Sequence, residues 1–138
     1  MPLTIRPYAP DDQDAVIALW EACHLVVPQN DAIADIRTKI QFQPDLFLVA
    51  IATDRLVGTV MAGYEGHRGW INYLAVAPAH RRQGIARRMM AAAEEKLRAL
   101  GCPKINLQVR HTNTTVVKFY RAIGFGEDDV ISLGKRLG

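Results

Sequence analysis

The segment 70–109 constrains the fold of this chain more than any other. It contains an apolar run, "WINYLAV" at 70–76, an amphipathic stretch at 84–100 and a second apolar run, "KINLQV" at 104–109. A strand, a helix and a strand in this order form a right-handed crossover whose two strands lie parallel in one sheet. The segment therefore predicts a parallel βαβ unit.

The remaining segments predict further strands and helices around this unit. Strands are expected where apolar and polar residues alternate or where turn residues bound a short apolar run, and helices where apolar residues recur every three or four positions. The additional strands are expected at 3–8, 46–52, 56–65 and 130–137, and the additional helices at 11–24, from Asp31 onward, and at 113–123. The expected fold class is α/β, or α+β with a mixed sheet: mostly antiparallel strands, one parallel crossover, and one domain over residues 1–138.

The cysteine content indicates a reduced, cytoplasmic setting, and the net charge is compatible with an anionic ligand. The 138 residues include 17 Lys and Arg against 14 Asp and Glu, a net charge of +3. This excess is compatible with an anionic ligand but is too small to establish nucleic-acid binding. Cys23 and Cys102 have no metal-ligand spacing, so no metal is predicted. The sequence shows no signal peptide pattern, and its longest apolar run, 46–52, is too short to span a membrane.

Positive charge is concentrated at the expected start of the helix at 84–100. Gly84 is flanked by Arg81, Arg82, Arg87 and Arg88. A helix N-terminus carries about half a positive charge, so cations are unfavourable there unless an anion lies between them. Gly84 lets the backbone approach a phosphate, and guanidinium groups match phosphate oxygens. The pattern predicts a polyphosphate site, and the alternative interpretation is a solvated basic surface.

The loop sequence distinguishes this site from two well-known phosphate motifs. It reads R-R-Q-G-I-A, an instance of [Q/R]-x-x-G-x-[G/A], and contains neither a P-loop nor a dinucleotide fingerprint. With "LAVAPAHRRQGIA" and "NTTVVKFYRAIGF", the second similar to N-x-x-A-x-x-F-Y-x-x-x-G-F, the chain resembles the GNAT N-acetyltransferases over essentially its whole length. Within that family it is most similar to the small bacterial YpeA-like acetyltransferases, through "GTVMAGYEGHRG", "GCPKI" and "SLGKRL". Val116 stands where the family often has alanine.

The resemblance implies an N-acetyltransferase that uses acetyl-coenzyme A as cofactor and transfers the acetyl group to a primary amine by direct attack in a ternary complex. In such enzymes the strands equivalent to 70–76 and 104–109 splay apart, and pantetheine lies in the gap. The residues expected to bind the cofactor are Leu74, Ala75, Val76, Arg81, Arg82, Gln83, Gly84, Ile85, Ala86, Arg87 and Asn113. Asn113 has an alternative role as a plain helix N-cap.

Tyr120 is the residue expected to act in the chemistry, by protonating the coenzyme A thiolate as it leaves or by donating a hydrogen bond to the sulfur without full transfer. Its alternative role is to cover the helix at 113–123. A general base is also expected, because the attacking amine must be neutral. Some relatives use a glutamate where this chain has Gln108, which cannot accept a proton at neutral pH. Glu65, His67 and His111 are the remaining candidates.

The acceptor is expected to enter opposite the cofactor, under the loop "CHLVVPQN" at 23–30, with Tyr64, Trp70 and Tyr73 as neighbours. The acceptor is expected to be a small-molecule or peptide amine. Dimers are common among relatives, so a homodimer is also considered. Two alternatives belong to other classes. A non-catalytic acyl-CoA-binding regulatory module would keep the arginine loop without turnover, and a nucleic-acid-binding domain would need a broader basic face.

Overall fold

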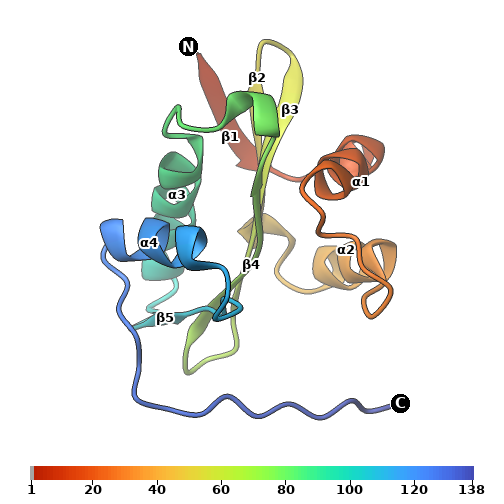
Figure 1. Cartoon of the computed structure of the whole chain (residues 1–138). Coiled ribbons are helices and arrows are strands. Elements are labelled where there is room, and N and C mark those ends of the chain that lie inside the picture. The colour runs from red at the N-terminus through yellow and green to blue at the C-terminus, as the bar shows by residue number, and fades with distance from the viewer. Residues whose placement is uncertain (1) are drawn as a thin grey trace. The chain divides into compact units, whose positions relative to one another are not determined.

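A five-stranded mixed sheet organises the first part of the chain. The computed structural model describes residues 2–138, which form two compact units that divide after Leu107. The strands lie in chain order, with α1 and α2 on one face of the sheet and α3 on the other (Figure 1). They are β1 (Leu3–Pro7), β2 (Phe47–Ala52), β3 (Arg55–Tyr64), β4 (Gly69–Val76) and β5 (Ile105–Asn106). The helices of this unit are α1 (Gln13–Ala22), α2 (Ala32–Gln41) and α3 (Ile85–Ala99).

The strand pairing confirms the predicted fold class. The pairs β1–β2, β2–β3 and β3–β4 are antiparallel, and β4–β5 is parallel. The parallel ladder has two residue pairs, Gly69 with Ile105 and Trp70 with Asn106. The strand predicted at 104–109 is therefore shorter than expected, and β4 continues to Val76 after β5 has ended. The two strands of the crossover are partners only at their beginning.

Helix α3 buries an apolar face against the sheet. Ile85, Met89, Ala93 and Leu97 recur at helical spacing and are buried, as the sequence predicted. Leu100, expected on the same face, is 51% exposed because the helix ends before it. Gly101 adopts a φ of +83°, and the N–H of Cys102 bonds the carbonyl of Leu97 at 3.1 Å. This Schellman ending uses the left-handed conformation that glycine adopts without strain.

The second unit, Gln108–Gly138, contains one helix, α4 (Thr114–Ala122). The strand predicted at 130–137 is wrong, since these residues have no regular structure. Their apolar side chains are solvated: Val130, Ile131, Leu133 and Leu137 are between 77% and 94% exposed. A strand needs a ladder partner, and no described strand pairs with this segment.

Helix α2 buries a lysine. The buried residues of this helix are Ala32, Ile36 and Lys39, whereas Ile33 and Ile40 are exposed. The Lys39 ammonium donates to the carbonyl of Ala62 on β3, and burial lowers the pKa of Lys39. In the described part of the chain, no helix has the length and apolarity that crossing a membrane requires.

A buried polar chain links α1 to the centre of the sheet. The indole N–H of Trp20 donates to Oγ1 of Thr59 at 2.9 Å, and that hydroxyl donates to the carbonyl of Tyr73 at 2.8 Å. Thr59 is fully buried. One hydroxyl therefore satisfies the indole N–H of the fully buried Trp20 and the carbonyl of the half-buried Tyr73.

This arrangement predicts the cost of removing the hydroxyl. Thr59→Val keeps the side-chain shape but leaves the Trp20 N–H and the Tyr73 carbonyl without partners, at about 1–3 kcal/mol for each buried group. Urea unfolding should show a loss of about 2–4 kcal/mol relative to the wild type. Thr4→Val on the exposed edge strand is the matched control, expected within about 0.5 kcal/mol of the wild type. Equal losses in the two variants would contradict the role given to Thr59.

Candidate active site

The loop between β4 and α3 is exposed and contains two residues in the left-handed conformation. After a short 3-10 turn at Pro78–His80, residues 81–84 lie at the surface. Arg82 has a φ of +64° and Gly84 a φ of +79°. No atom lies within 4 Å of the position that a Cβ on Gly84 would take. The loop therefore follows a strained path past open space at the start of a helix.

The first N–H groups of α3 follow Gly84 directly along the chain. The earliest intrahelical bond of α3 runs from the N–H of Arg88 to the carbonyl of Gly84, at 3.1 Å. The N–H groups of Ile85, Ala86 and Arg87 precede it, and groups in these positions have no acceptor inside a helix. The side chain of Ile85 is buried, so this residue offers only its backbone. The first turn holds no acidic side chain, and the arrangement suits an anion.

Arg81 differs from the other arginines of the loop. Its Nε donates to the carbonyl of Val76 at 3.2 Å, and its Nη2 lies 3.6 Å from Sγ of Cys23. The Cys23 thiol donates to the same carbonyl at 3.4 Å. The Arg81 guanidinium thus binds the end of β4, although Arg81 is exposed, as are Arg82, Arg87 and Arg88.

Strand β4 is interrupted close to the loop. Its register against β3 shifts between Thr59 and Met61, and Tyr73 has a φ of +52°. Beyond Trp70 no described strand pairs with β4 on the side of β5. Leu74, Ala75 and Val76, which the sequence predicts to contact pantetheine, lie in this unpaired part. The loop at 81–84 and the open part of β4 are thus neighbours in one unit.

Tyr120 lies in the second unit and is 8% exposed. Its ring packs edge-to-face on Phe119 and Phe125, with centroids 5.2 and 5.5 Å away. Burial raises the pKa of Tyr120 to about 12. A thiol of pKa near 8.5 is then about 3.5 units more acidic, so full transfer of the tyrosine proton to a thiolate costs about 5 kcal/mol. Donating a hydrogen bond to the sulfur carries no such cost.

The other sequence-predicted residues of the second unit are exposed. Asn113 occupies the N-cap position of α4, but its side chain makes no capping bond. The Gln108 side chain donates to the hydroxyl of Ser132, and His111 is solvated.

Two of the candidate bases, Glu65 and His67, lie on the turn between β3 and β4, and the structure of the turn accounts for their presence. The Glu65 carboxylate accepts the N–H groups of His67 and Arg68, each at 2.5 Å. These bonds lower the pKa of Glu65, with the Arg68 bond the larger cause, and make it a weaker base. His67 is exposed at the tip of the same turn.

The sequence reasoning missed the partner of Tyr73. The Tyr73 hydroxyl donates to Oδ2 of Asp35 in α2 at 2.6 Å, and burial together with this carboxylate raises the pKa of Tyr73. Asp35 and Tyr73 are 38 residues apart. The sequence signal for this bond is weak: Asp31 and Asp35 are four residues apart and so share a helix face. The same spacing is typical of a solvated helix face.

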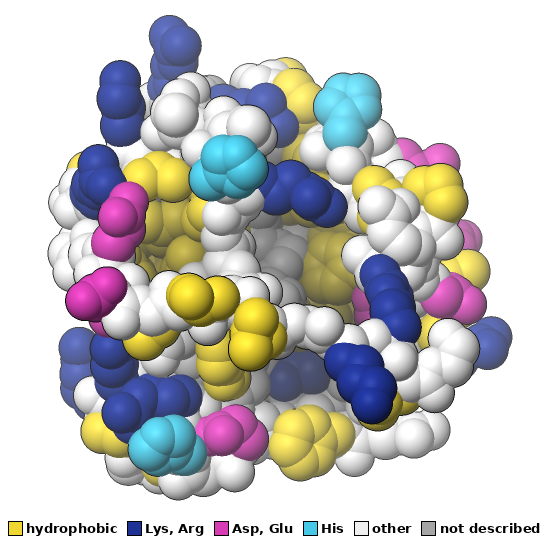
Figure 2. All heavy atoms as spheres, turned by 60° about the horizontal axis from the view of Figure 1, so that its bottom comes forward, with side chains coloured by type: hydrophobic (Ala, Val, Ile, Leu, Met, Phe, Trp, Pro, Cys, Tyr) yellow, Lys and Arg dark blue, Asp and Glu magenta, His cyan; other side chains and the backbone are white. Residues whose placement is uncertain are grey.

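Basic side chains do not form a continuous strip on the face shown in Figure 2. There, Lys and Arg side chains are interspersed with hydrophobic and acidic ones. A nucleic-acid interface needs a broad basic surface or an aromatic platform.

Comparisons with known proteins agree with the arrangement of the loop and the sheet. The sequence profile of the acetyltransferase (GNAT) family matches residues 12–125. An acetyltransferase of Pectobacterium atrosepticum is 48% identical over 135 residues, covering 98% of this chain and 96% of the relative.

Solved structures show the same fold. The aminoglycoside N-acetyltransferase AAC(6')-Iy, determined with coenzyme A, superposes with a TM-score of 0.81 at 20% identity, covering 99% of this chain and 96% of that chain. The PaiA N-acetyltransferase of Thermoplasma acidophilum, also with coenzyme A, gives a TM-score of 0.78 at 19% identity, with 95% and 94% covered.

The profile match and the close relative confirm the predicted enzyme class and acetyl-CoA as its cosubstrate. The particular site residues and the acceptor stay predictions. By its sequence over nearly the full length, and by the sheet and loop described above, this chain belongs to the GNAT family of N-acetyltransferases.

Proposed function

We propose that the protein, acting as a single domain over residues 1–138, transfers the acetyl group of acetyl-CoA to a primary amine by direct attack in a ternary complex. The observation that carries the proposal is the start of α3, where the space beside Gly84 is open and the N–H groups that follow lack helical acceptors. This lies beside the unpaired part of β4. A polyphosphate joined to an extended amide-bearing arm matches both features.

The cofactor-binding residues follow from this match. The pyrophosphate would lie against the backbone of Gln83, Gly84, Ile85 and Ala86, with Arg82 and Arg87 contributing charge. Pantetheine would extend along Leu74, Ala75 and Val76 like an added strand. Arg81 would have to leave the carbonyl of Val76 before that carbonyl could bind pantetheine.

The chemical step needs a neutral nitrogen and a stabilised leaving group. The amine nitrogen attacks the thioester carbon, the C–N bond forms, and the C–S bond breaks to release the thiolate, while the nitrogen loses its proton to water. At pH 7 a lysine-like amine costs roughly 4–5 kcal/mol to deprotonate, and an α-amine little more than about 1. The Tyr120 hydroxyl would donate a hydrogen bond to the sulfur, and Asn113 would contact the pantetheine arm.

A regulatory module that binds acyl-CoA without turnover is the second candidate, because Gln108 replaces the glutamate that serves some relatives as a base. One experiment separates the two: acetyl-CoA is mixed with an amine panel, and free thiol release and melting temperature are followed together. Stabilisation with turnover supports the enzyme, and stabilisation alone supports the module. The cytoplasmic location and the homodimer stay predictions.

The first prediction tests phosphate access at Gly84. Asn and Asp both tolerate the left-handed conformation and have the same shape, so Gly84→Asn and Gly84→Asp differ mainly in charge. Calorimetry should show coenzyme A binding at least about tenfold weaker in the Asp variant than in the Asn variant, because a carboxylate faces the pyrophosphate. Both should unfold at similar urea concentrations. Equal affinities in the two folded variants would remove the pyrophosphate from this position.

The second prediction tests the loop arginine. Arg82→Gln removes one exposed charge beside Gly84 and should weaken coenzyme A binding about tenfold, since charge-assisted bonds contribute about 1.5–3 kcal/mol. Binding of acetyl-pantetheine, which lacks the nucleotide phosphates, should be unchanged. Arg88→Gln in α3 is the matched control and should lose less. If Arg82→Gln weakened both ligands equally, Arg82 would not contact phosphate.

The third prediction concerns Tyr120. Tyr120→Phe keeps the ring contacts with Phe119 and Phe125 and should lower kcat by roughly 10²-fold, with the Kd of acetyl-CoA nearly unchanged. Because the pKa of Tyr120 is about 12, its hydroxyl stays protonated up to pH 10. Between pH 8 and 10, the kcat of the wild type should therefore change with pH in the same way as the kcat of the variant. A variant with wild-type kcat would exclude Tyr120 from the step.

A further inference from the structure

The carbonyl of Val76, the last residue of β4, points away from β3. The N–H of Ala77 donates to the carbonyl of Val57 in β3 at 2.8 Å. In a trans peptide unit the N–H and the C=O point in opposite directions, so the Val76 carbonyl points to the other side of β4. On that side β5 pairs only with the start of the strand. This carbonyl is therefore one of the backbone groups that we assign to pantetheine.

The Val76 carbonyl already accepts two hydrogen bonds. The Cys23 thiol donates to it at 3.4 Å, and Nε of Arg81 donates to it at 3.2 Å. A carbonyl oxygen has two lone pairs, so these two donors use its accepting capacity. A third donor, such as an amide N–H of pantetheine, can bind this oxygen only after one of the two has left.

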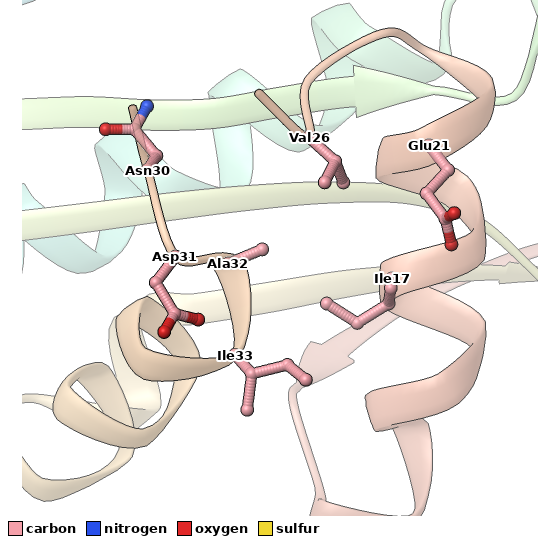
Figure 3. A pocket seen from close by; sticks show the side chains of 7 residues that line it. All are labelled: Ile17, Glu21, Val26, Asn30, Asp31, Ala32 and Ile33. Carbon is pink, nitrogen blue, oxygen red and sulfur yellow. The ribbon is translucent and has the colours of Figure 1, made fainter. Parts of the chain in front are cut away.

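The Cys23 thiol is the donor that is less free to leave. Cys23 is half-buried at the end of α1, and its N–H bonds the carbonyl of Leu19 at 3.0 Å. Val26, on the loop that follows, lines a groove with Ile17 and Glu21 of α1, so the chain after Cys23 lies back against this helix (Figure 3). Cys23 also packs against the apolar core on this face of the sheet.

Arg81 is exposed, and its charge has no ion-pair partner among the described residues. Its Nη2 lies 3.6 Å from Sγ of Cys23, and its Nε binds a neutral carbonyl. A guanidinium binds a phosphate more strongly than a neutral carbonyl, because both partners of the bond are then charged. Gly84, where we place the pyrophosphate, is three residues further along the same exposed loop. Phosphate groups there would draw Arg81 away from Val76.

We propose that Arg81 makes the binding of the pantetheine arm conditional on the binding of the phosphates. Its guanidinium holds the Val76 carbonyl until a phosphate takes the guanidinium, and the carbonyl then becomes available to the arm. Arg81 therefore selects a thioester that carries phosphates against one that lacks them. This inference rests on the proposed function, and it gives Arg81 a role that differs from that of Arg82, which contributes charge alone.

The test measures the coupling between two fragments of the cosubstrate, acetyl-pantetheine and inorganic pyrophosphate. NMR titration of the wild type should show acetyl-pantetheine binding at least about fivefold more tightly with saturating pyrophosphate than without it, the lower end of common coupling between two sites. Arg81→Met keeps the apolar stem and removes the donors. This variant should bind acetyl-pantetheine more tightly than the wild type does without pyrophosphate, and added pyrophosphate should no longer change that affinity.

Arg88→Met is the matched control. It removes the same charge from an exposed position on α3 and should keep the coupling of the wild type. Because both arginines are exposed, both variants should unfold at the urea concentration of the wild type.

Two results would overturn the inference: a wild type without coupling, which needs no variant, and coupling that persists in Arg81→Met. Failure of the proposed function looks different, because it shows as no thiol release from acetyl-CoA with any amine. The coupling between the two fragments is measured without that reaction.

Discussion

The separation of β4 from its neighbours is the constraint on which the site depends. A strand in the middle of a sheet normally has both edges bonded, but β4 loses β5 after Trp70 and slips its register against β3 at Tyr73. Backbone groups on this edge of β4 are thereby left without a strand partner, and the buried hydroxyl of Thr59 holds the displaced Tyr73 carbonyl. The positive φ of Tyr73 is tolerated because Trp20, Thr59 and Asp35 each fix a different part of the residue.

Local patterns made much of this fold predictable. The helical spacing of Ile85, Met89, Ala93 and Leu97 specified the buried face of α3, and Gly84 and Gly101 marked its two ends. Each of these signals depends on residues within one or two helical turns. The crossover followed from the order of such elements, because handedness and strand direction are set by general sterics.

Other features depend on partners far away in the sequence. The alternation of apolar and polar residues at 130–137 is typical of a strand. A strand also needs the edge of a neighbouring strand, and the apolar residues of this segment are solvated instead. Lys39 lies at a helical position that the sequence leaves ambiguous, and the carbonyl of Ala62 explains its burial. The Asp35–Tyr73 bond joins two elements across a strand irregularity that no periodicity reveals. The burial of Tyr120, which raises the pKa of its hydroxyl, also depends on its surroundings in the fold and favours hydrogen-bond donation over full proton transfer in the proposed step.

The part of β4 that β5 does not pair is also a strand edge. Exposed strand edges are templates on which another extended chain can add, and proteins usually protect them with charge, twist or a covering element. Here the Arg81 side chain blocks the last carbonyl, and the irregularity at Tyr73 bends the strand away from a flat edge. A ligand that occupies this edge would mask it as an added strand does, and would stabilise the folded form by mass action.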